Sequence, residues 1–266
     1  MKRQRQTDIF GNIRYGKVIT VTLGDQAENS VHMQKIGKLK EHGLSEKDMF
    51  ELVKEFGKLE YRCFLHDLTR GRRDLAQGQG AYLLVIKNFI GDRRKKDLFN
   101  ELEALDWDKK KVLKMNDTLT IVTSRRSYNL CFSDFEQKPD LENRKGRVVK
   151  WDDVPVLKEV KEELENVFQG RCGDLQGEGN YYFDAKKCNI GWHGDEERKV
   201  VVGLRVGDDF PLRYQWRKNW KNVGEEMTFT LSGGDVYIMS EKAVGHDWKD
   251  KDKYVLTHSA GIQKQK

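Results

Sequence analysis

Apolar residues recur along most of this chain in short runs whose spacing indicates the elements they form. Runs rich in β-branched or apolar residues at 18–23, 81–86 and 118–123 predict strands. Helical spacing of apolar residues predicts helices after the capping sequence Ser45-Glu46-Lys47-Asp48 and over 96–107. Strands and helices therefore alternate in the first 130 residues, as they do in an α/β lobe.

The second half of the chain has a different pattern. Pro155 opens a helix whose apolar residues Leu157, Val160, Leu164 and Val167 form a stripe suited to core packing. After it, short strands with Gly-rich turns are expected at 180–183, 190–195, 199–206, 212–217, 227–231, 235–239 and 253–259. The sequence thus predicts an α+β protein: an N-terminal α/β lobe at 1–132, a connecting segment at 133–154, and a double-stranded β-helix (jelly-roll) core at 155–266.

Composition limits the setting in which the protein acts. Among the 266 residues, 35% are charged and 37% are apolar, and no apolar run approaches the roughly 18 residues of a membrane span. The four cysteines, Cys63, Cys131, Cys172 and Cys188, have no paired spacing and are expected to be free thiols. We therefore expect an intracellular protein of the cytoplasm or nucleus, and the sequence makes no prediction of its oligomeric state.

The net charge of +6 favours a polyanionic partner, such as DNA or RNA. Basic runs occur at 93–96, 109–111, 125–126 and 144–145, although each run alone is more typical of a solvated surface. The segment 214–220 mixes aromatic residues with cations, which suits either base stacking or the filling of a barrel.

One constellation suggests metal chemistry. His193 and Asp195 are two residues apart on a predicted strand, so their side chains should leave the same face. His246 follows the predicted strand 235–239 and is the expected third ligand; His258 is the competing choice. Two histidines and one carboxylate form the facial triad that holds iron(II) in non-haem oxygenases.

Gly179-Asn180-Tyr181-Tyr182 and Gly191-Trp192-His193-Gly194-Asp195 resemble the Asn-x-Tyr and Trp-His-x-Asp motifs of the AlkB-like Fe(II)/2-oxoglutarate dioxygenases. Gly234-Asp235, His246 and Lys253-Tyr254-Val255-Leu256-Thr257 are similar to that family's later motifs, and the resemblance covers about residues 180–260. It implies that His193, Asp195 and His246 hold iron and act in catalysis. It further implies that 2-oxoglutarate is bound by Asn180, Tyr182, Thr257 and, at its far carboxylate, Lys253.

The chain departs from this family at two positions, because Lys253 and Ser259 stand where arginines are expected. A lysine offers a point charge rather than a bidentate fork. The resemblance implies an oxygenase that hydroxylates a C–H bond, possible substrates being nucleic acids that are demethylated or modified on a base. The alternatives are a protein or small-molecule hydroxylase of the same superfamily, and a non-enzymatic jelly-roll binding protein with a degenerate site.

Overall fold

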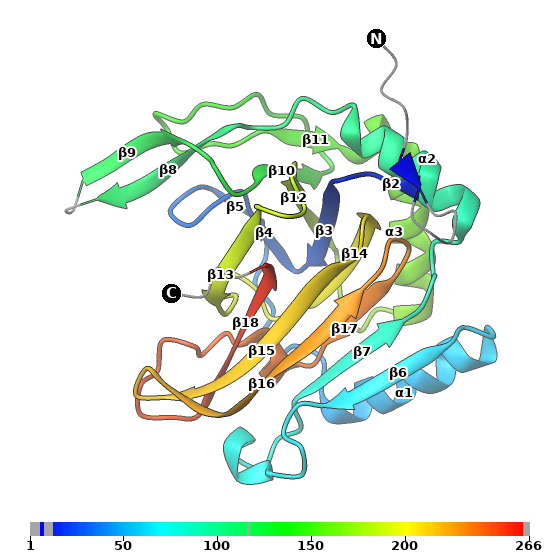
Figure 1. Cartoon of the computed structure of the whole chain (residues 1–266), viewed down its shortest axis with the longest axis vertical. Helices are drawn as coiled ribbons and strands as arrows, with labels where there is room; N and C mark the ends of the chain where they lie inside the picture. Colours follow the sequence, from blue (N-terminus) through cyan, green and yellow to red (C-terminus); the bar gives the residue numbers. More distant parts are fainter. Residues whose placement is uncertain (1–5, 8–12, 116–117, 263–266) are drawn as a thin grey trace.

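Two sheets dominate the structure, a computed structural model that describes residues 6–7, 13–115 and 118–262. The large sheet has eight strands in the order β11-β10-β12-β3-β14-β17-β7-β6, and the small sheet has four in the order β13-β18-β15-β16 (Figure 1). Within the large sheet, β10 and β11 pair in parallel and all other neighbours are antiparallel. The protein is therefore α+β with mostly antiparallel sheets, as the sequence predicts at this level.

The bounds of the strands are as follows. The large sheet contains β3 (Val18–Gly24), β6 (Cys63–Asp67), β7 (Tyr82–Ile86), β10 (Tyr128–Ser133), β11 (Val148–Lys150), β12 (Gln176–Tyr182), β14 (Val201–Gly207) and β17 (Val236–Met239). The small sheet contains β13 (Asn189–His193), β15 (Phe210–Lys218), β16 (Lys221–Leu231) and β18 (Val255–Gly261). Three separate pairs are β1 (Gln6–Thr7) with β2 (Ile13–Arg14), β4 (Gln26–Glu28) with β5 (Lys35–Gly37), and β8 (Lys110–Met115) with β9 (Thr118–Thr123).

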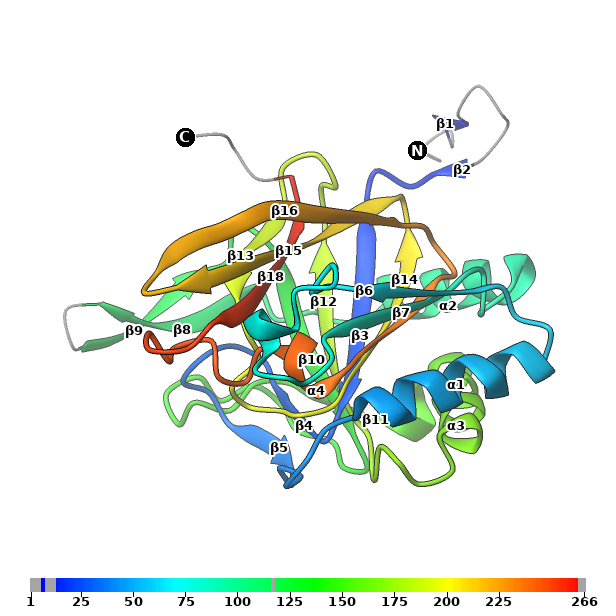
Figure 2. The same ribbon diagram turned by 90° about the horizontal axis from the view of Figure 1, so that it is seen from below.

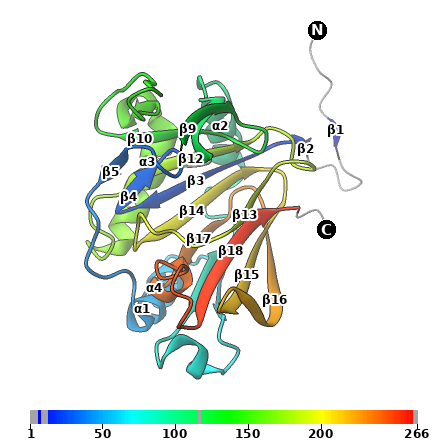
Figure 3. The ribbon, with the colours of Figure 1, turned by 90° about the vertical axis from the view of Figure 1, so that its left-hand side faces the viewer.

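Three helices cover one face of the large sheet, and the small sheet lies on its other side (Figures 2 and 3). They are α1 (Glu46–Lys58), α2 (Asp92–Glu103) and α3 (Pro155–Phe168). The helix α1 begins at the predicted capping box, in which the Ser45 hydroxyl accepts the backbone N–H of Asp48. Shorter helices are α4 (Glu241–Val244) and 3-10 turns at Arg73–Ala76 and Trp151–Asp153. Among the described residues, no helix is long and apolar enough to cross a membrane.

The strand β14 shows how one sequence serves both faces of the large sheet. Val202, Leu204 and Val206 pack in the core beneath the helices, whereas Val201 packs with residues of the small sheet. Alternate residues of a strand point to opposite faces, so a strand covered on both sides is apolar throughout. The only charged residue within β14 is Arg205, which is 1% exposed and lies on the face toward the small sheet.

The strand β3 belongs to the predicted N-terminal lobe, but it lies in the sheet that also contains strands of the predicted C-terminal core. It lies between β12 and β14 and pairs with both, so that Thr20 stands opposite Asn180 and Arg205. The segment 1–132 therefore contributes central strands to the same sheet as 155–266, and the predicted separate N-terminal lobe is corrected. A strand's local pattern indicates that it is a strand but not which distant strand it joins.

Gly203 on β14 provides a test of packing between the sheets. A Cβ atom at this position would lie 1.9 Å from Cζ of Tyr237, so the ring has no room to remain in place. We expect Gly203→Ala to destabilise the protein by about 1–3 kcal/mol, the usual cost of overpacking. The matched control is Gly57→Ala in α1, where a Cβ meets nothing within 4 Å and should stabilise the helix by roughly 0.5–1 kcal/mol. Urea unfolding measures both, and equal effects would contradict the packing described here.

Candidate metal centre

His193, Asp195 and His258 come together between the two sheets. Nε2 of His193 lies 3.4 Å from Oδ1 of Asp195, and Nε2 of His258 lies 3.5 Å from the same oxygen. One donor atom from each residue lies within 4.8 Å of the other two. The rings of the two histidines are 4.4 Å apart and inclined at 63°. Two nitrogens and one oxygen therefore lie close enough together to hold one metal ion.

The pairing of β13 with β18 accounts for this meeting. His193 is the last residue of β13 and stands directly opposite His258 on β18. Between Ile190 and His193 the register shifts by a bulge, a feature that re-aims side chains beside functional sites. Asp195 lies just beyond the strand, and its backbone N–H donates to the carbonyl of Val244 at 3.1 Å. This backbone hydrogen bond fixes the position of Asp195 relative to the two histidines.

Hydrogen bonding and burial prepare these side chains for a cation. Nδ1 of His193 lies 2.8 Å from the carbonyl oxygen of Gly191, and this contact orients the ring so that Nε2 faces Asp195. Burial opposes ionisation of Asp195, but its interactions with His258, His193 and Arg198 outweigh burial and hold the pKa of Asp195 well below the usual range. Burial and the neighbouring His193 lower the pKa of His258. Burial opposes protonation of His193, but the hydrogen bond and charge of Asp195 outweigh it and raise the pKa of His193. A metal ion would therefore displace a proton from this ring, because metals require a deprotonated carboxylate and neutral imidazoles.

A second layer of charge surrounds the three residues. The guanidinium of Arg198, 2% exposed, pairs with Glu178 and donates to Glu197 at 2.9 Å, and its Nε lies 3.9 Å from Asp195. Among the described residues, Nη1 of Arg198, Nδ1 of His258 and the hydroxyl of Tyr214 are buried without a hydrogen-bond partner. Buried polar groups are normally paired. These three groups leave hydrogen-bonding capacity around the triad that a water molecule or a polar ligand could fill.

The structure replaces two of the predicted site residues. His246 does not join His193 and Asp195; its Nδ1 lies 3.2 Å from the carbonyl oxygen of Arg198, and the third histidine is His258. Lys253 precedes β18, is exposed, and pairs with Asp250 at 3.1 Å. The expected role of Thr257 required its face of β18 to point toward the site, whereas the structure directs the opposite face, with His258, toward it. A one-residue difference in register moves every side chain of a strand to the other face.

Of the residues expected to bind the cosubstrate, some lie near the candidate site and others do not. Tyr182 is inside, packed against Phe210 with ring centroids 4.6 Å apart. Asn180 is buried, but its amide accepts from Asn129 at 2.6 Å and donates to Glu178 at 2.9 Å. Thr257 follows the opposite face of β18 from His258, and its hydroxyl donates to the carbonyl of Gln215 at 3.0 Å. Of these three, only Tyr182 and Asn180 remain near the candidate site.

Arg205 is the functional candidate that the sequence reading missed. Its Nε donates to the hydroxyl of Thr20 at 3.2 Å, and its guanidinium lies 5.4 Å and 5.8 Å from the ring centroids of Phe210 and Tyr237. Within the described residues it has no carboxylate at salt-bridge distance, and burial lowers its pKa. Asp235, an acid that acts on it from a distance, is itself paired with Lys87. The available signal was one arginine inside the otherwise apolar run 200–206.

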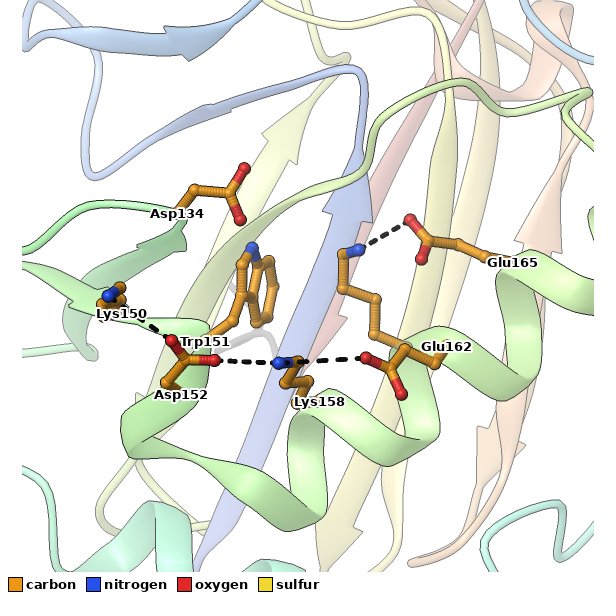
Figure 4. A pocket seen from close by; sticks show the side chains of 8 residues that line it. Asp134, Lys150, Trp151, Asp152, Lys158, Glu162 and Glu165 are labelled. Carbon is orange, nitrogen blue, oxygen red and sulfur yellow. Dashed lines mark hydrogen bonds and ion pairs between the residues drawn. The ribbon is translucent and has the colours of Figure 1, made fainter.

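A surface pocket elsewhere does not compete with this site. It has a volume of about 330 Å³ and lies beside α3, lined by Trp151 and charged residues (Figure 4). Those charges are paired with one another: Lys158 lies 2.8 Å from Asp152, and Lys161 lies 2.7 Å from Glu165. Internal neutralisation leaves little charge for a ligand, so we assign the pocket no function.

Glu28 gives a pH-dependent test of the acidic surroundings. Burial, followed by repulsion from Glu197 and Glu178, raises the pKa of Glu28 to about 7. The folded state therefore holds this proton more tightly than the unfolded state, so its contribution to stability is complete below about pH 4.5 and is lost as the pH rises through about 7. We expect Glu28→Gln to gain stability relative to the wild type between pH 5 and pH 8. Melting temperatures across this range measure the difference, and parallel pH profiles would contradict the account.

Comparison with known proteins identifies one relative, whose activity is not described. No protein-family model matches the chain. An uncharacterized protein of Acanthamoeba polyphaga mimivirus is 40% identical over 251 residues, which cover 93% of this chain and 97% of the viral protein. The similarity therefore extends over the N-terminal strands and the triad-bearing segment together.

Proposed function

This chain belongs to the family of that mimivirus protein, and we propose that it is an Fe(II)- and 2-oxoglutarate-dependent oxygenase with a jelly-roll core. The observation that carries the proposal is the convergence of His193, Asp195 and His258 on one point. Two imidazoles and one carboxylate on a single side suit iron(II) and leave other coordination positions for small ligands.

The strand order supports the jelly-roll assignment. From 176 to 261 the chain passes back and forth between the two sheets, with β12, β14 and β17 in the large sheet and β13, the hairpin β15–β16 and β18 in the small one. An eight-stranded double-sheet jelly roll needs one further strand. In our assignment β3 fills that place between β12 and β14, although it comes from the first part of the sequence.

Arg205 supports the choice of a dicarboxylate cosubstrate. A buried cation without a neighbouring carboxylate is costly unless an anion joins it. Tyr237 interacts electrostatically with both Arg205 and Asp195, which supports a common interior for the guanidinium and the triad. We therefore assign to Arg205, rather than Lys253, the far carboxylate of 2-oxoglutarate, with Thr20 and Tyr182 beside it.

Each side chain then has a defined task. Iron(II) would supply the redox chemistry that couples oxidative decarboxylation of 2-oxoglutarate to hydroxylation of a substrate C–H bond. His193, Asp195 and His258 hold the metal, and Gly191 fixes the orientation of the His193 ring. Arg205 orients the cosubstrate by its far end, and the surrounding apolar side chains of Leu256 and Trp216 exclude water.

Turnover of 2-oxoglutarate tests the proposal. We expect the protein with iron(II) and oxygen to convert 2-oxoglutarate slowly to succinate without added substrate, and Asp195→Asn to lose this conversion while remaining folded. Lys253→Met is the matched control and should keep the wild-type rate, because Lys253 is exposed and paired with Asp250. Absence of turnover in the wild type, with iron bound, would favour the non-enzymatic alternative.

A further inference from the structure

The turn between β15 and β16 departs from two rules of hairpin stability. It joins Lys218 to Lys221 through Asn219 and Trp220, whose φ angles are both positive, at 47° and 63°. Such a turn favours Asn-Gly, and a bulky side chain is strained at positive φ. Lys218 and Lys221 also stand directly opposite each other, although like charges at paired positions destabilise a hairpin. Departures of this kind are typical of residues kept for a function.

Trp220 presents its ring to solvent at the end of this hairpin, where the side chain is 55% exposed. Trp216, four residues earlier, is 3% exposed and packs between the sheets. The loop before β18 lies beside the turn, and the backbone N–H of Asn219 donates to the carbonyl of Lys251 at 3.1 Å (Figures 1 and 2). Trp248 of that loop lies edge-on to Trp220, with ring centroids 6.3 Å apart. The loop therefore supports the exposed ring from one side.

The lysines around Trp220 lack carboxylate partners. Among the described residues, Lys218, Lys221 and Lys251 have no carboxylate within 4.0 Å. By contrast, Lys253 of the same loop lies 3.1 Å from Asp250. We call Trp220 and the three unpaired lysines the hairpin tip. It combines an exposed aromatic ring with positive charge that no acidic group of the described chain neutralises.

We propose that the hairpin tip docks on the surface of an anionic lipid bilayer, with the Trp220 ring in the interfacial layer and the three lysines among the headgroups. Tryptophan is enriched where membranes meet water, because its ring is apolar and its N–H is polar. Lysines close to an anionic leaflet each strengthen binding. A two-residue turn is convex, whereas small-molecule ligands are taken up in concave sites. A soft surface that admits an exposed ring therefore fits the tip better than a small ligand does.

The test compares two changes at the tip with matched changes elsewhere, all in the full chain. Trp220→Gly removes the ring, and Lys218→Gln with Lys221→Gln removes two unpaired charges. The controls are Leu59→Ser, at a side chain that is also 55% exposed, and Lys47→Gln with Lys187→Gln, at lysines whose carboxylate partners are Glu51 and Asp184. Cosedimentation measures binding to vesicles of phosphatidylcholine alone and of phosphatidylcholine with phosphatidylserine. Polyglutamate and a single-stranded oligonucleotide are the soluble anions for comparison.

We expect the wild type and both controls to bind the vesicles that contain phosphatidylserine and to bind neutral vesicles much more weakly. The double lysine variant should bind roughly 25-fold more weakly, because each lysine near the surface contributes about fivefold. Trp220→Gly should lose about tenfold or more through the apolar area that no longer leaves water. It should nevertheless melt at the wild-type temperature or above, because glycine adopts positive φ without strain.

Absence of binding to the anionic vesicles, equal binding to the neutral ones, or equal losses in tip and control variants would overturn the proposal. So would wild-type binding by both tip variants. Binding of polyglutamate or of the oligonucleotide that the tip variants weaken, without binding of vesicles, would assign the surface to another anion. The proposal is independent of the oxygenase chemistry, because none of these measurements depends on the metal centre.

Discussion

Replacing His258 with alanine is expected to weaken iron(II) binding by more than about 100-fold, whereas His246→Ala should leave it within a few-fold of the wild type. His258 has its Nε2 3.5 Å from the shared Asp195 oxygen, while His246 is directed to the carbonyl of Arg198. Loss of an outer partner of a metal ligand typically costs 10–100-fold in affinity, so loss of a ligand itself should cost more.

Anaerobic titration with iron(II), followed by measurement of retained metal, checks this expectation. His246→Ala serves as the matched control, since it removes an imidazole close to the same loop without removing a donor from the triad. His258→Gln separates loss of the ligand from loss of packing, because it keeps much of the side-chain volume between the two sheets. Retention of iron by His258→Ala together with its loss in His246→Ala would restore the original assignment of the distal ligand.

Replacing Arg205 with methionine is expected to raise the apparent Kd for 2-oxoglutarate by roughly 30-fold or more. Removing one partner of a buried charge pair costs about 2–5 kcal/mol, and 1.4 kcal/mol corresponds to tenfold. Iron binding should be unchanged, because Arg205 is not among the residues whose donor atoms converge. Lys253→Met should leave both affinities within about twofold of the wild type.

Two further measurements separate this binding role from a structural one. Without cosubstrate, Arg205→Met should unfold at nearly the same urea concentration as the wild type, since the arginine it removes has no carboxylate partner among the described residues. A 2-oxo acid that lacks the far carboxylate should bind the wild type weakly. Its affinity should change little in Arg205→Met. If both ligands weaken equally in the variant, Arg205 supports the fold rather than the carboxylate.

Local sequence pattern was sufficient for many elements of the fold. The predicted strands at 18–23 and 81–86 and the helix opened by Pro155 are present as β3, β7 and α3. Each is defined by residues close in sequence: β-branched runs, a fixed proline and an apolar stripe. The position of β3 between β12 and β14 depends on pairing with strands more than 150 residues away, which no local pattern contains.

The candidate site was predictable to the same extent and for the same reason. His193 and Asp195 are neighbours in sequence, so their convergence followed from spacing. His258 was harder to choose because β18 is buried along its whole length, and such a strand has no apolar and polar alternation to fix its register. Arg205 was overlooked because a single charge in an apolar run has no motif, although a buried arginine is itself a rare feature.

The central claim is tested most directly by the visible absorption of the protein with iron(II) and 2-oxoglutarate under anaerobic conditions. If His193, Asp195 and His258 hold iron and Arg205 holds the cosubstrate, the wild type and His246→Ala should both develop a charge-transfer band. The band should be absent in His258→Ala and should require far more 2-oxoglutarate in Arg205→Met. A wild-type protein that binds iron(II) but develops no band at saturating 2-oxoglutarate would contradict the account.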